Sequence, residues 1–261
     1  MNASKNISVV IPMYDAEKFI LSTLESVAAQ TVSPLEVIVV DDGSRDGTCS
    51  AVEFFERNNS HINLRILREE HKGPGNARNV GIYAAKGTWI AFLDSDDLWY
   101  PNKLREIELA HEARPEANLF CHNEMHRRIH GVESILDYSK SFQPEVPFSK
   151  QLYFNNCLST SAVVCRRDLI LFYGGFDVSL PNAQDYELWL KMSPSLNIFF
   201  VKKVLGIYVD RVGNISSNRK WGKYKNVIRV LHRHRKKVSV GVYLRSIIKT
   251  STSYIYRSLV P

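Results

Sequence analysis

The chain has 261 residues, of which 44% are hydrophobic, and this is enough to bury one large core or one domain with an appended subdomain. Its net charge is +7, but residues 219–261 hold 12 Lys and Arg and no acid, which leaves −5 on the preceding 218 residues. This composition argues against a disordered chain, and no stretch approaches the roughly 20 apolar residues of a membrane-spanning helix.

The cysteines and the first residues indicate the compartment. The chain has no CxxC pair, so neither a zinc site nor a disulfide framework is signalled, and a reducing compartment fits best. The start, MNASKNISVVIPMYD, lacks a basic segment followed by a long apolar one. We therefore expect a cytoplasmic protein that does not itself span the membrane.

Short β-branched runs alternate with helical patterns along the first hundred residues. Strands are predicted at ISVVIP, LEVIVV, NLRIL and TWIAFL, and helices within residues 16–31, 48–55 and 76–86. Strands this apolar, separated by helices, are typical of a parallel sheet that is covered on both faces. Ligands of such sheets bind at the carboxyl ends of the strands.

Two acidic motifs follow two of these strands, DDGS at residues 41–44 and DSDD at residues 94–97. They would repel each other at one sheet edge unless a cation joined them, and Mg²⁺ or Mn²⁺ prefers carboxylate and phosphate oxygens. In an extended segment Asp94 and Asp96 point to the same side, so they can share a ligand. Alone this signal is weak, because Asp96 or Asp97 can simply cap the following helix.

A glycine-containing loop precedes the third helix. The segment HKGPGNARNVG sets Gly73, Pro74 and Gly75 before Arg78 at a predicted helix start. Free backbone N–H groups and a cation at that position suit a phosphate, although the same residues can form an ordinary loop. Three such features on one sheet edge are a stronger indication than any one of them.

These segments together resemble the family 2 glycosyltransferases with the GT-A fold, of the type that builds bacterial surface polysaccharides such as lipopolysaccharide, capsule and O-antigen. The resemblance lies in SVVIPMYD, VIVVDDGSRDGT, GPGNARNVGIYAAKGTWIAFLDSDD, WYPNKL and GGFDVSLPNAQDYELWLKM, which follow the family's order. It implies a mostly parallel, Rossmann-like α/β sheet flanked by helices. Residues 1–110 would bind a nucleotide sugar, 111–210 would bind the acceptor and carry catalysis, and 211–261 would form a basic amphipathic extension.

The resemblance also implies roles for single residues. Asp42 would recognise the base, which favours a UDP-sugar, and Asp96 would be the direct ligand of Mn²⁺ or Mg²⁺, assisted by Asp94 and Asp97. The donor-binding positions that it implies are Pro12, Tyr14, Asp41, Asp42, Gly75, Arg78, Asp94 and Ser95.

The catalytic base is implied by NAQDYELWL. Asp185 stands where the family's Glu-Asp motif carries its base, with Gln184 in place of the frequent Glu. An acceptor hydroxyl needs such a base, and transfer would be an inverting displacement without a covalent intermediate. Without the resemblance, Asp185 reads as an acid that the helix macrodipole favours.

One segment departs from the family's pattern. A Tyr-Arg-x-His-like sequence is frequent after the base region, whereas IYVDRVGNIS has Val209 and Arg211 at those places. Arg211 is a permanent cation and can reach a phosphate, but no histidine is expected to complete a metal site. We interpret His232 and His234 as solvated members of the basic run.

The basic tail interleaves cations with Val, Leu, Ile and Tyr, as a peripheral segment on the anionic inner face of the cell membrane does. A solvated helix face remains an alternative, and no nucleic acid is expected because no nucleic-acid motif is visible. The predicted enzyme therefore moves a sugar to a hydroxyl of a glycan acceptor, which we expect to be lipid-linked. The alternatives are a sugar-nucleotide nucleotidyltransferase and a non-catalytic relative that binds polyanions.

Overall fold

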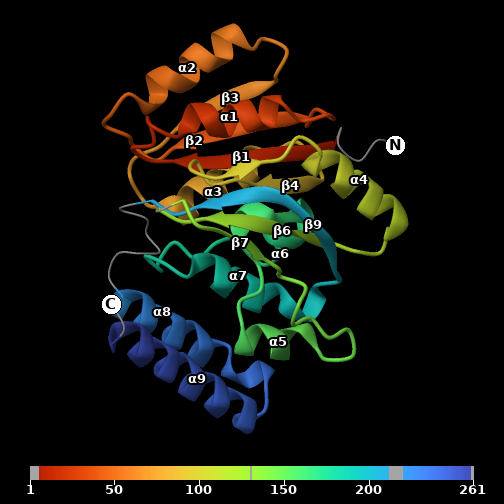
Figure 1. Ribbon diagram of the computed structural model, residues 1–261, viewed down its shortest axis with the longest axis vertical. Coiled ribbons are helices and arrows are strands. Elements are labelled where there is room, and N and C mark those ends of the chain that lie inside the picture. The colour runs from red at the N-terminus through yellow and green to blue at the C-terminus, as the bar shows by residue number, and fades with distance from the viewer. Residues whose placement is uncertain (1–5, 130, 212–219, 260–261) are drawn as a thin grey trace.

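The predicted strands and helices assemble into a central sheet with helices on both faces (Figure 1). The computed structural model describes residues 6–129, 131–211 and 220–259. The strands in these ranges are β1 (Ile7–Met13), β2 (Glu36–Asp41), β3 (Leu64–Arg68), β4 (Trp89–Phe92), β5 (Leu98–Trp99), β6 (Leu119–Arg127), β7 (Glu133–Leu136), β8 (Val163–Arg166) and β9 (Ile198–Val209). The helices are α1 (Ile20–Ala28), α2 (Thr48–Asn58), α3 (Pro74–Ala84), α4 (Lys103–Ala113), α5 (Phe148–Phe154), α6 (Arg167–Phe172), α7 (Gln184–Met192), α8 (Lys220–Arg233) and α9 (Val240–Leu259).

The strand order is β3-β2-β1-β4-β8-β6-β9-β5, with β7 paired to β6. Strands β3, β2, β1 and β4 run parallel, as expected, so their carboxyl ends reach one edge of the sheet. The rest of the sheet is mixed, because β8 runs antiparallel to both β4 and β6, whereas β9 runs parallel to β6. The pairing of β4 with β8 continues the sheet from the predicted nucleotide-binding half into the predicted acceptor half.

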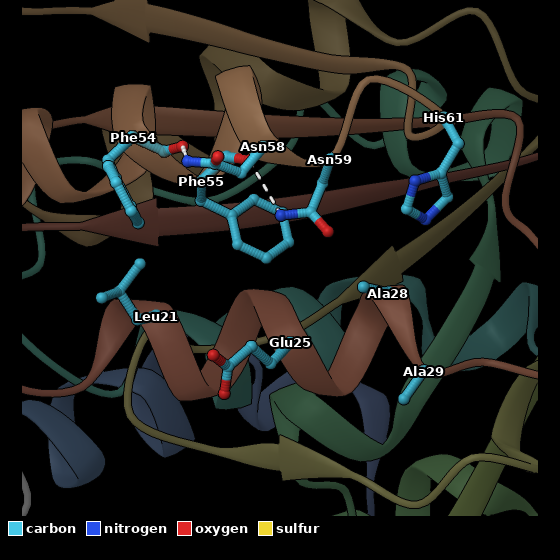
Figure 2. Close-up of a pocket in the computed structure, with 9 residues that line it drawn as sticks. All are labelled: Leu21, Glu25, Ala28, Ala29, Phe54, Phe55, Asn58, Asn59 and His61. Atoms are coloured by element: carbon cyan, nitrogen blue, oxygen red, sulfur yellow. Dashed lines mark hydrogen bonds between the residues drawn. The ribbon is translucent and has the colours of Figure 1, made fainter.

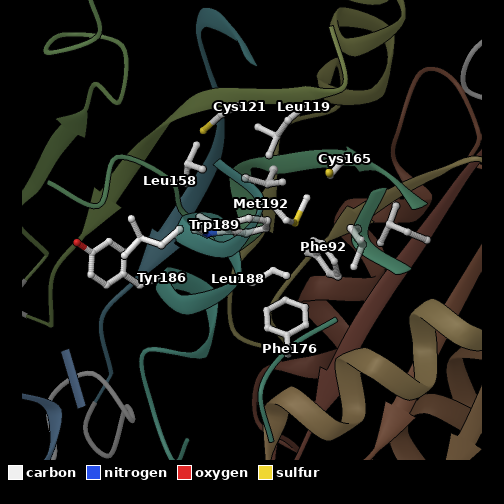
Figure 3. Close-up of a cluster of buried hydrophobic side chains, with 14 of the residues drawn as sticks. Phe92, Leu119, Cys121, Leu158, Cys165, Phe176, Tyr186, Leu188, Trp189 and Met192 are labelled. Atoms are coloured by element: carbon white, nitrogen blue, oxygen red, sulfur yellow. The ribbon is translucent and has the colours of Figure 1, made fainter. Parts of the chain in front are cut away.

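Alternate side chains of the inner strands enter two different cores, as the two-residue period of a strand requires. Val9 and Ile11 of β1 pack with α1, α2 and α4, whereas Val10 packs with α3 and α7. Figure 3 shows the second core, in which Phe176 lies edge-on to Phe92 of β4 at 5.5 Å between ring centroids. Trp189 of α7 is fully buried in the same cluster, and this anchors α7 against the sheet.

Some element boundaries differ from the predicted ones, each for a local reason. The third helix begins at Pro74 and not at Asn76, because proline is favoured at the first helical position and Gly73 turns the chain with φ +92°. The first helix begins only at Ile20, because the carbonyl of Ala16 closes a turn with the N–H groups of Phe19 and Ile20. Strand β8 begins only at Val163, because the preceding residues Thr160–Ala162 form a 3₁₀ turn.

The basic C-terminal segment forms a helical hairpin, which in Figure 1 lies at the opposite end of the molecule from α2. Lys237, between α8 and α9, donates hydrogen bonds to two carbonyl groups at the end of α7, those of Leu190 and Lys191. The expectation that His234 is solvated is wrong: it is 7% exposed, and its Nε2 lies 3.3 Å from Oε1 of Glu187, because this end of α8 packs against α7. Among the described residues, we find no helix with the length and apolar character needed to span a bilayer.

Candidate functional site

The acidic motifs lie at the carboxyl edge of the parallel strands. Met13, the last residue of β1, is in register with Asp41, and the N–H of Asp42 donates to the carbonyl of Met13. On the other side of β1, strand β4 ends at Phe92, two residues before Asp94. Pro12, Tyr14, Asp41, Asp42 and Asp94, all predicted donor-site residues, are thereby brought to one edge.

Asp42 organises the loop that opens α3. Its side chain is almost fully buried, and its two carboxylate oxygens accept the backbone N–H groups of Lys72 at 2.8 Å and Gly73 at 2.9 Å. The Nδ1 atom of His71 lies 2.9 Å from Oδ2 of the same carboxylate. Asp41 has a local role as well, since its Oδ1 accepts the N–H of Ser44 at 3.1 Å. Asp42 therefore ties the end of β2 to the start of α3.

Two aromatic rings stand beside Asp42. The ring of Tyr14 stacks on that of His71 with a centroid separation of 4.2 Å and a tilt of 32°. Tyr14 is 38% exposed and the His71 side chain 56%, so the pair faces solvent. An exposed aromatic surface next to a buried carboxylate suits a planar ring that carries a hydrogen-bond donor. Sequence reasoning missed His71, although it stands in the quoted loop two residues before Gly73.

The DSDD motif places two of its carboxylates against arginines. Asp94 pairs with Arg78 of α3, and Asp96 pairs with Arg211, which follows β9. The guanidinium carbon of Arg211 also lies 4.7 Å from the ring centroid of Phe19. Burial and the negative charge of Asp94 raise the pKa of Asp96, and Arg211 opposes this shift. Residues far apart in the sequence thus form one cluster of alternating charge.

Asp97 points the other way, into the protein. It is 2% exposed, and its two oxygens accept the Ser161 hydroxyl at 2.6 Å and the N–H of Val209 at 3.0 Å. Burial, together with the nearby Glu124, raises its pKa well above the ordinary range. The side chain of Asp97 thus holds the end of β9 close to the DSDD loop, apart from the Asp94 and Asp96 pairs with arginine. Its assignment as a metal ligand stays a prediction.

Ser95 and Ser161 hold the DSDD loop in place through hydrogen bonds. Ser95 is 7% exposed, and its carbonyl accepts the hydroxyl of Thr23 in α1 at 2.9 Å. The hydroxyl oxygen of Ser161 accepts the N–H of Asp94 at 3.1 Å while it donates to Asp97. The loop therefore depends on one residue in α1 and one in the turn before β8. The role of Ser161 was not predicted, since LSTSAVVC has no local signal for it.

The donor set fits a hard divalent cation. Asp94 and Asp96 offer carboxylate oxygens, the ligand type that Mg²⁺ and Mn²⁺ prefer. A cation between them would also relieve the repulsion that contributes to the raised pKa of Asp96. Across residues 6–129, 131–211 and 220–259, no group of three or more His, Cys, Asp and Glu side chains is arranged as a metal site.

Asp185 lies in the first turn of α7, where it is partly exposed, and the Nδ2 atom of Asn156 is 3.5 Å from its Oδ2. Two residues before it stands Ala183, a non-glycine residue held in the left-handed region at φ +57°. Such backbone strain persists only where the surroundings enforce it, and it is frequent at functional sites. Glu187 points inward instead, with 3% of its side chain exposed and Lys191 at 3.4 Å.

The start of α7 packs directly on the start of α3. Gln184 is buried and donates to the carbonyl of Leu180 at 2.6 Å. Its side chain fills the space beside Gly75, where an added Cβ atom would approach it to 2.7 Å. Gly75, predicted as a donor-site residue, thus allows this contact. Since Arg78 lies one turn further along α3, Asp185 belongs to the same region of the molecule as the Arg78 and Asp94 pair.

The hollow drawn in Figure 2 is a different feature. It has a volume of about 440 Å³, lies between α1 and α2, and is lined by Leu21, Glu25, Ala28, Ala29, Phe54, Phe55, Asn58, Asn59 and His61. Most of these residues belong to the C-terminal halves of the two helices, away from the strand ends that carry the aspartates. The hollow contains none of the predicted site residues.

Comparisons with known proteins identify relatives of this chain. A glucosyltransferase of Escherichia coli, UDP-Glc:alpha-D-GlcNAc-diphosphoundecaprenol beta-1,3-glucosyltransferase WfgD, is 33% identical over 215 residues, 82% of this chain and 80% of that protein. A glycosyltransferase of Rickettsia bellii (strain RML369-C) is 30% identical over 213 residues, which are 76% of this chain but 29% of that protein. The chain therefore spans less than a third of the length of this second relative.

The fold is matched by solved structures. Residues 1–349 of Staphylococcus aureus TarS, crystallised with UDP-GlcNAc, align with a TM-score of 0.74 and 25% identity over 92% of this chain and 70% of that one. The family model for glycosyl transferase family 2 matches residues 8–169, which include the DDGS and DSDD motifs. The GT-A architecture expected from the sequence is thereby confirmed, and the chain belongs to glycosyl transferase family 2.

Proposed function

We propose that the protein transfers a sugar from a nucleotide-diphosphate donor, with a UDP-sugar favoured, to a hydroxyl of a lipid-linked glycan. The observation that carries this proposal is the convergence on one edge of Asp42 with its aromatic pair and the Asp94 and Asp96 cluster. The start of α7, which carries Asp185, packs against the start of α3 beside this edge. Two similarities support the choice of substrates: the E. coli relative is a UDP-Glc enzyme that acts on a diphosphoundecaprenol-linked GlcNAc, and TarS was solved with UDP-GlcNAc.

The donor base would lie against Tyr14 and His71, beside Asp42. The Oδ2 atom of Asp42 lies 2.9 Å from Nδ1 of His71, and the carboxylate retains acceptor capacity for an N–H group of a uracil ring. The sugar diphosphate would then extend along the strand ends to the start of α3. Arg78 would neutralise its charge there, since a guanidinium forms paired hydrogen bonds with phosphate oxygens.

Asp94 and Asp96 would hold Mn²⁺ or Mg²⁺, which when bound would neutralise the diphosphate as it leaves. Arg211 now neutralises Asp96, and the donor diphosphate offers the same side chain a second anionic partner. We therefore propose that Arg211 moves from the carboxylate to the phosphate when donor binds. The guanidinium group of Arg211 lies over the ring of Phe19. It would therefore stay near the DSDD loop whether it pairs with Asp96 or with the phosphate.

Asp185 would act as the general base. The acceptor hydroxyl oxygen forms a bond to the anomeric carbon, the bond from that carbon to the phosphate oxygen breaks, and the hydroxyl proton passes to Asp185. One displacement of this kind inverts the anomeric configuration. Partial exposure at the start of α7 gives an acceptor access to this carboxylate, whereas Glu187 is buried and paired. A lipid-linked acceptor would place the reaction at the inner face of the cell membrane.

A transfer assay tests the proposal. The full chain is incubated with Mn²⁺, a panel of UDP-, GDP- and dTDP-sugars, and an acceptor that carries a monosaccharide diphosphate on a short lipid; product is read by mass spectrometry and its anomeric configuration by NMR. Asp185→Asn should lower turnover at least about 100-fold, the typical contribution of a general base, without loss of UDP binding.

The matched control is Asp168→Asn, which changes another acid in the first turn of a helix, α6, where Asp168 pairs with Arg166. We expect this variant to turn over at the wild-type rate. Transfer that survives in Asp185→Asn would remove this residue as the base. If no sugar nucleotide is turned over with any acceptor of this class, the proposed substrates are wrong.

A further inference from the structure

The outer face of α9 carries a row of exposed apolar side chains. Leu244, Ile248 and Ile255 are 52%, 61% and 54% exposed, and Val240 and Tyr256 are exposed to 73% and 68%. Spacings of four and seven residues put the aliphatic members of this row on one side of a helix. We call these five residues the α9 outer row.

The other side of α9 belongs to the protein core. Val242, Tyr243 and Ile247 pack against the buried cluster that includes Trp189, and Ser246 is 1% exposed. Lys249 donates to the carbonyl of Phe154 at the end of α5. Because the inner face of α9 packs against the core, the side chains of the α9 outer row face solvent and do not contribute to the core.

The charged residues of the hairpin are all basic. Arg245 lies next to Leu244 and is exposed, and exposed cations at Lys225 and Arg229 of α8 and at Lys236 extend the basic surface of the hairpin. Residues 219–261 contain 12 Lys and Arg and no acid, whereas the preceding 218 residues carry −5. The hairpin is therefore the basic end of a molecule that is otherwise acidic.

We propose that the outer face of α9 docks the protein on an anionic lipid membrane. An amphipathic helix that combines large aliphatic side chains with Lys and Arg lies in the bilayer interface, with its apolar face among the upper acyl chains and its cations at the headgroups. A second copy of the chain is a poorer occupant, because a two-fold interface would bring two surfaces of the same positive sign together.

Docking in this orientation would bring the catalytic region close to a membrane-bound acceptor. This consequence rests on the proposed function, whereas the docking itself does not. The hairpin packs on α7 through His234 and Glu187 and through Lys237, and the first turn of α7 carries Asp185. An enzyme seated on the membrane by α9 would keep that helix close to a lipid-linked acceptor. The docking itself stands on the α9 outer row and on the charge, and it is tested without any sugar nucleotide.

The test is co-sedimentation of the full chain with vesicles of phosphatidylcholine and phosphatidylglycerol, and with vesicles of phosphatidylcholine alone. We expect binding to the anionic vesicles only, weakened by salt. The double variant L244S/I248S should bind more than about tenfold more weakly, because burial of two large aliphatic side chains is removed. Phe172→Ser is the control, since Phe172 on α6 is 80% exposed yet lies outside the α9 outer row; it should bind as the wild type does.

Equal binding of L244S/I248S and wild type, or no binding of wild type to anionic vesicles, would overturn the proposal. It would also be overturned if wild type were a dimer by light scattering and L244S/I248S a monomer, because the row would then be an interface between copies. Each variant is also assayed for sugar transfer to a water-soluble acceptor. Vesicle binding without transfer in the wild type counts against the proposed function and leaves the docking surface standing.

Discussion

The hydroxyl of Ser161 donates a hydrogen bond to Oδ2 of Asp97 over 2.6 Å, and both residues are buried. The same hydroxyl oxygen accepts the N–H of Asp94, and the other oxygen of Asp97 accepts the N–H of Val209. One serine and one aspartate thereby connect the DSDD loop, the turn before β8 and the end of β9. Asp94, Asp96 and Arg211 all stand on segments that this connection holds.

Ser161→Ala should therefore weaken both stability and turnover. It leaves an oxygen of the buried Asp97 and the N–H of Asp94 without their present partner, and a buried polar group without a partner costs about 1–3 kcal/mol. Urea unfolding should show a lower midpoint with an unchanged slope, and activity should require more Mn²⁺ for half-maximal turnover.

Ser193→Ala is the control for this prediction. Ser193 is also buried. Among the described residues, the one hydrogen bond of its hydroxyl group is the bond that it donates to the carbonyl of Leu190. Its loss should cost about 1 kcal/mol and leave the Mn²⁺ requirement unchanged. An unchanged metal requirement in Ser161→Ala as well would mean that the serine supports the fold without positioning the aspartates.

Asp42→Asn should weaken nucleotide binding. Both carboxylate oxygens of Asp42 accept backbone N–H groups, and an amide can offer only one acceptor oxygen while its NH₂ group faces a second donor. Loss of a hydrogen bond to a charged group, worth about 1.5–3 kcal/mol, corresponds to at least about tenfold weaker UDP binding by calorimetry.

Asp46→Asn is the control, because Asp46 also accepts two backbone N–H groups, those of Glu17 and Thr48. Equal UDP affinity in the Asp42 and Asp46 variants would contradict the role given to Asp42.

Glu187→Gln should change the pH dependence of stability. Burial acts to raise the pKa of Glu187, but hydrogen bonding to His234 and the charge of Lys191 outweigh it and hold the pKa below 4.5. A carboxylate with a lowered pKa stabilises the fold fully above its unfolded value, and this contribution is lost as the pH falls through the folded value. The variant should be less stable than wild type by about 1–3 kcal/mol near neutral pH.

The difference in stability should shrink as the pH falls below 4.5. Urea unfolding at a series of pH values measures it directly. A stability difference that keeps its full size in acid would show that the glutamine lowers stability through packing and not through lost charge.

Arg211→Ala should separate metal binding from catalysis. Arg211 now neutralises Asp96, so its removal should let the protein without nucleotide bind Mn²⁺ about tenfold more tightly, as expected when a competing charge-assisted contact is lost. Turnover should fall, because the donor diphosphate loses a cation.

Arg105→Ala is the control, because it breaks an ion pair with Glu108 on α4. It should change neither the Mn²⁺ affinity nor the turnover. Unchanged Mn²⁺ affinity in Arg211→Ala would show that the arginine does not compete with the metal.

The location of the acidic motifs could be predicted from the sequence because it follows from local pattern. Asp42 and Asp94 each come directly after a β-branched or apolar run that forms a parallel strand, so the edge that they share follows from the sheet. The region of Asp185 could be proposed only through family resemblance, because a first-turn acid on a helix is not specific.

The contacts that shape the site could not be predicted in the same way. Ser161 and Asp97 are 64 residues apart, and nothing in either local sequence indicates that they meet. His234 belongs to a run of cations that reads as solvated, yet α8 folds back on α7 and buries it beside Glu187. These relationships depend on which helix packs against which, and that is decided by long-range burial.

The most direct test of the central claim measures UDP binding to the wild type and to Asp96→Asn by thermal shift, with and without Mn²⁺. Ligand at a hundred times its dissociation constant stabilises the native state by about 2.7 kcal/mol. We predict that Mn²⁺ increases the UDP-dependent rise of Tm in the wild type, more than it does with GDP, CMP or dTDP, and that this increase is absent in Asp96→Asn. Equal shifts with and without Mn²⁺ in both proteins, or no shift with any nucleotide, would contradict the assignment of Asp96 as the metal ligand of a nucleotide-sugar site.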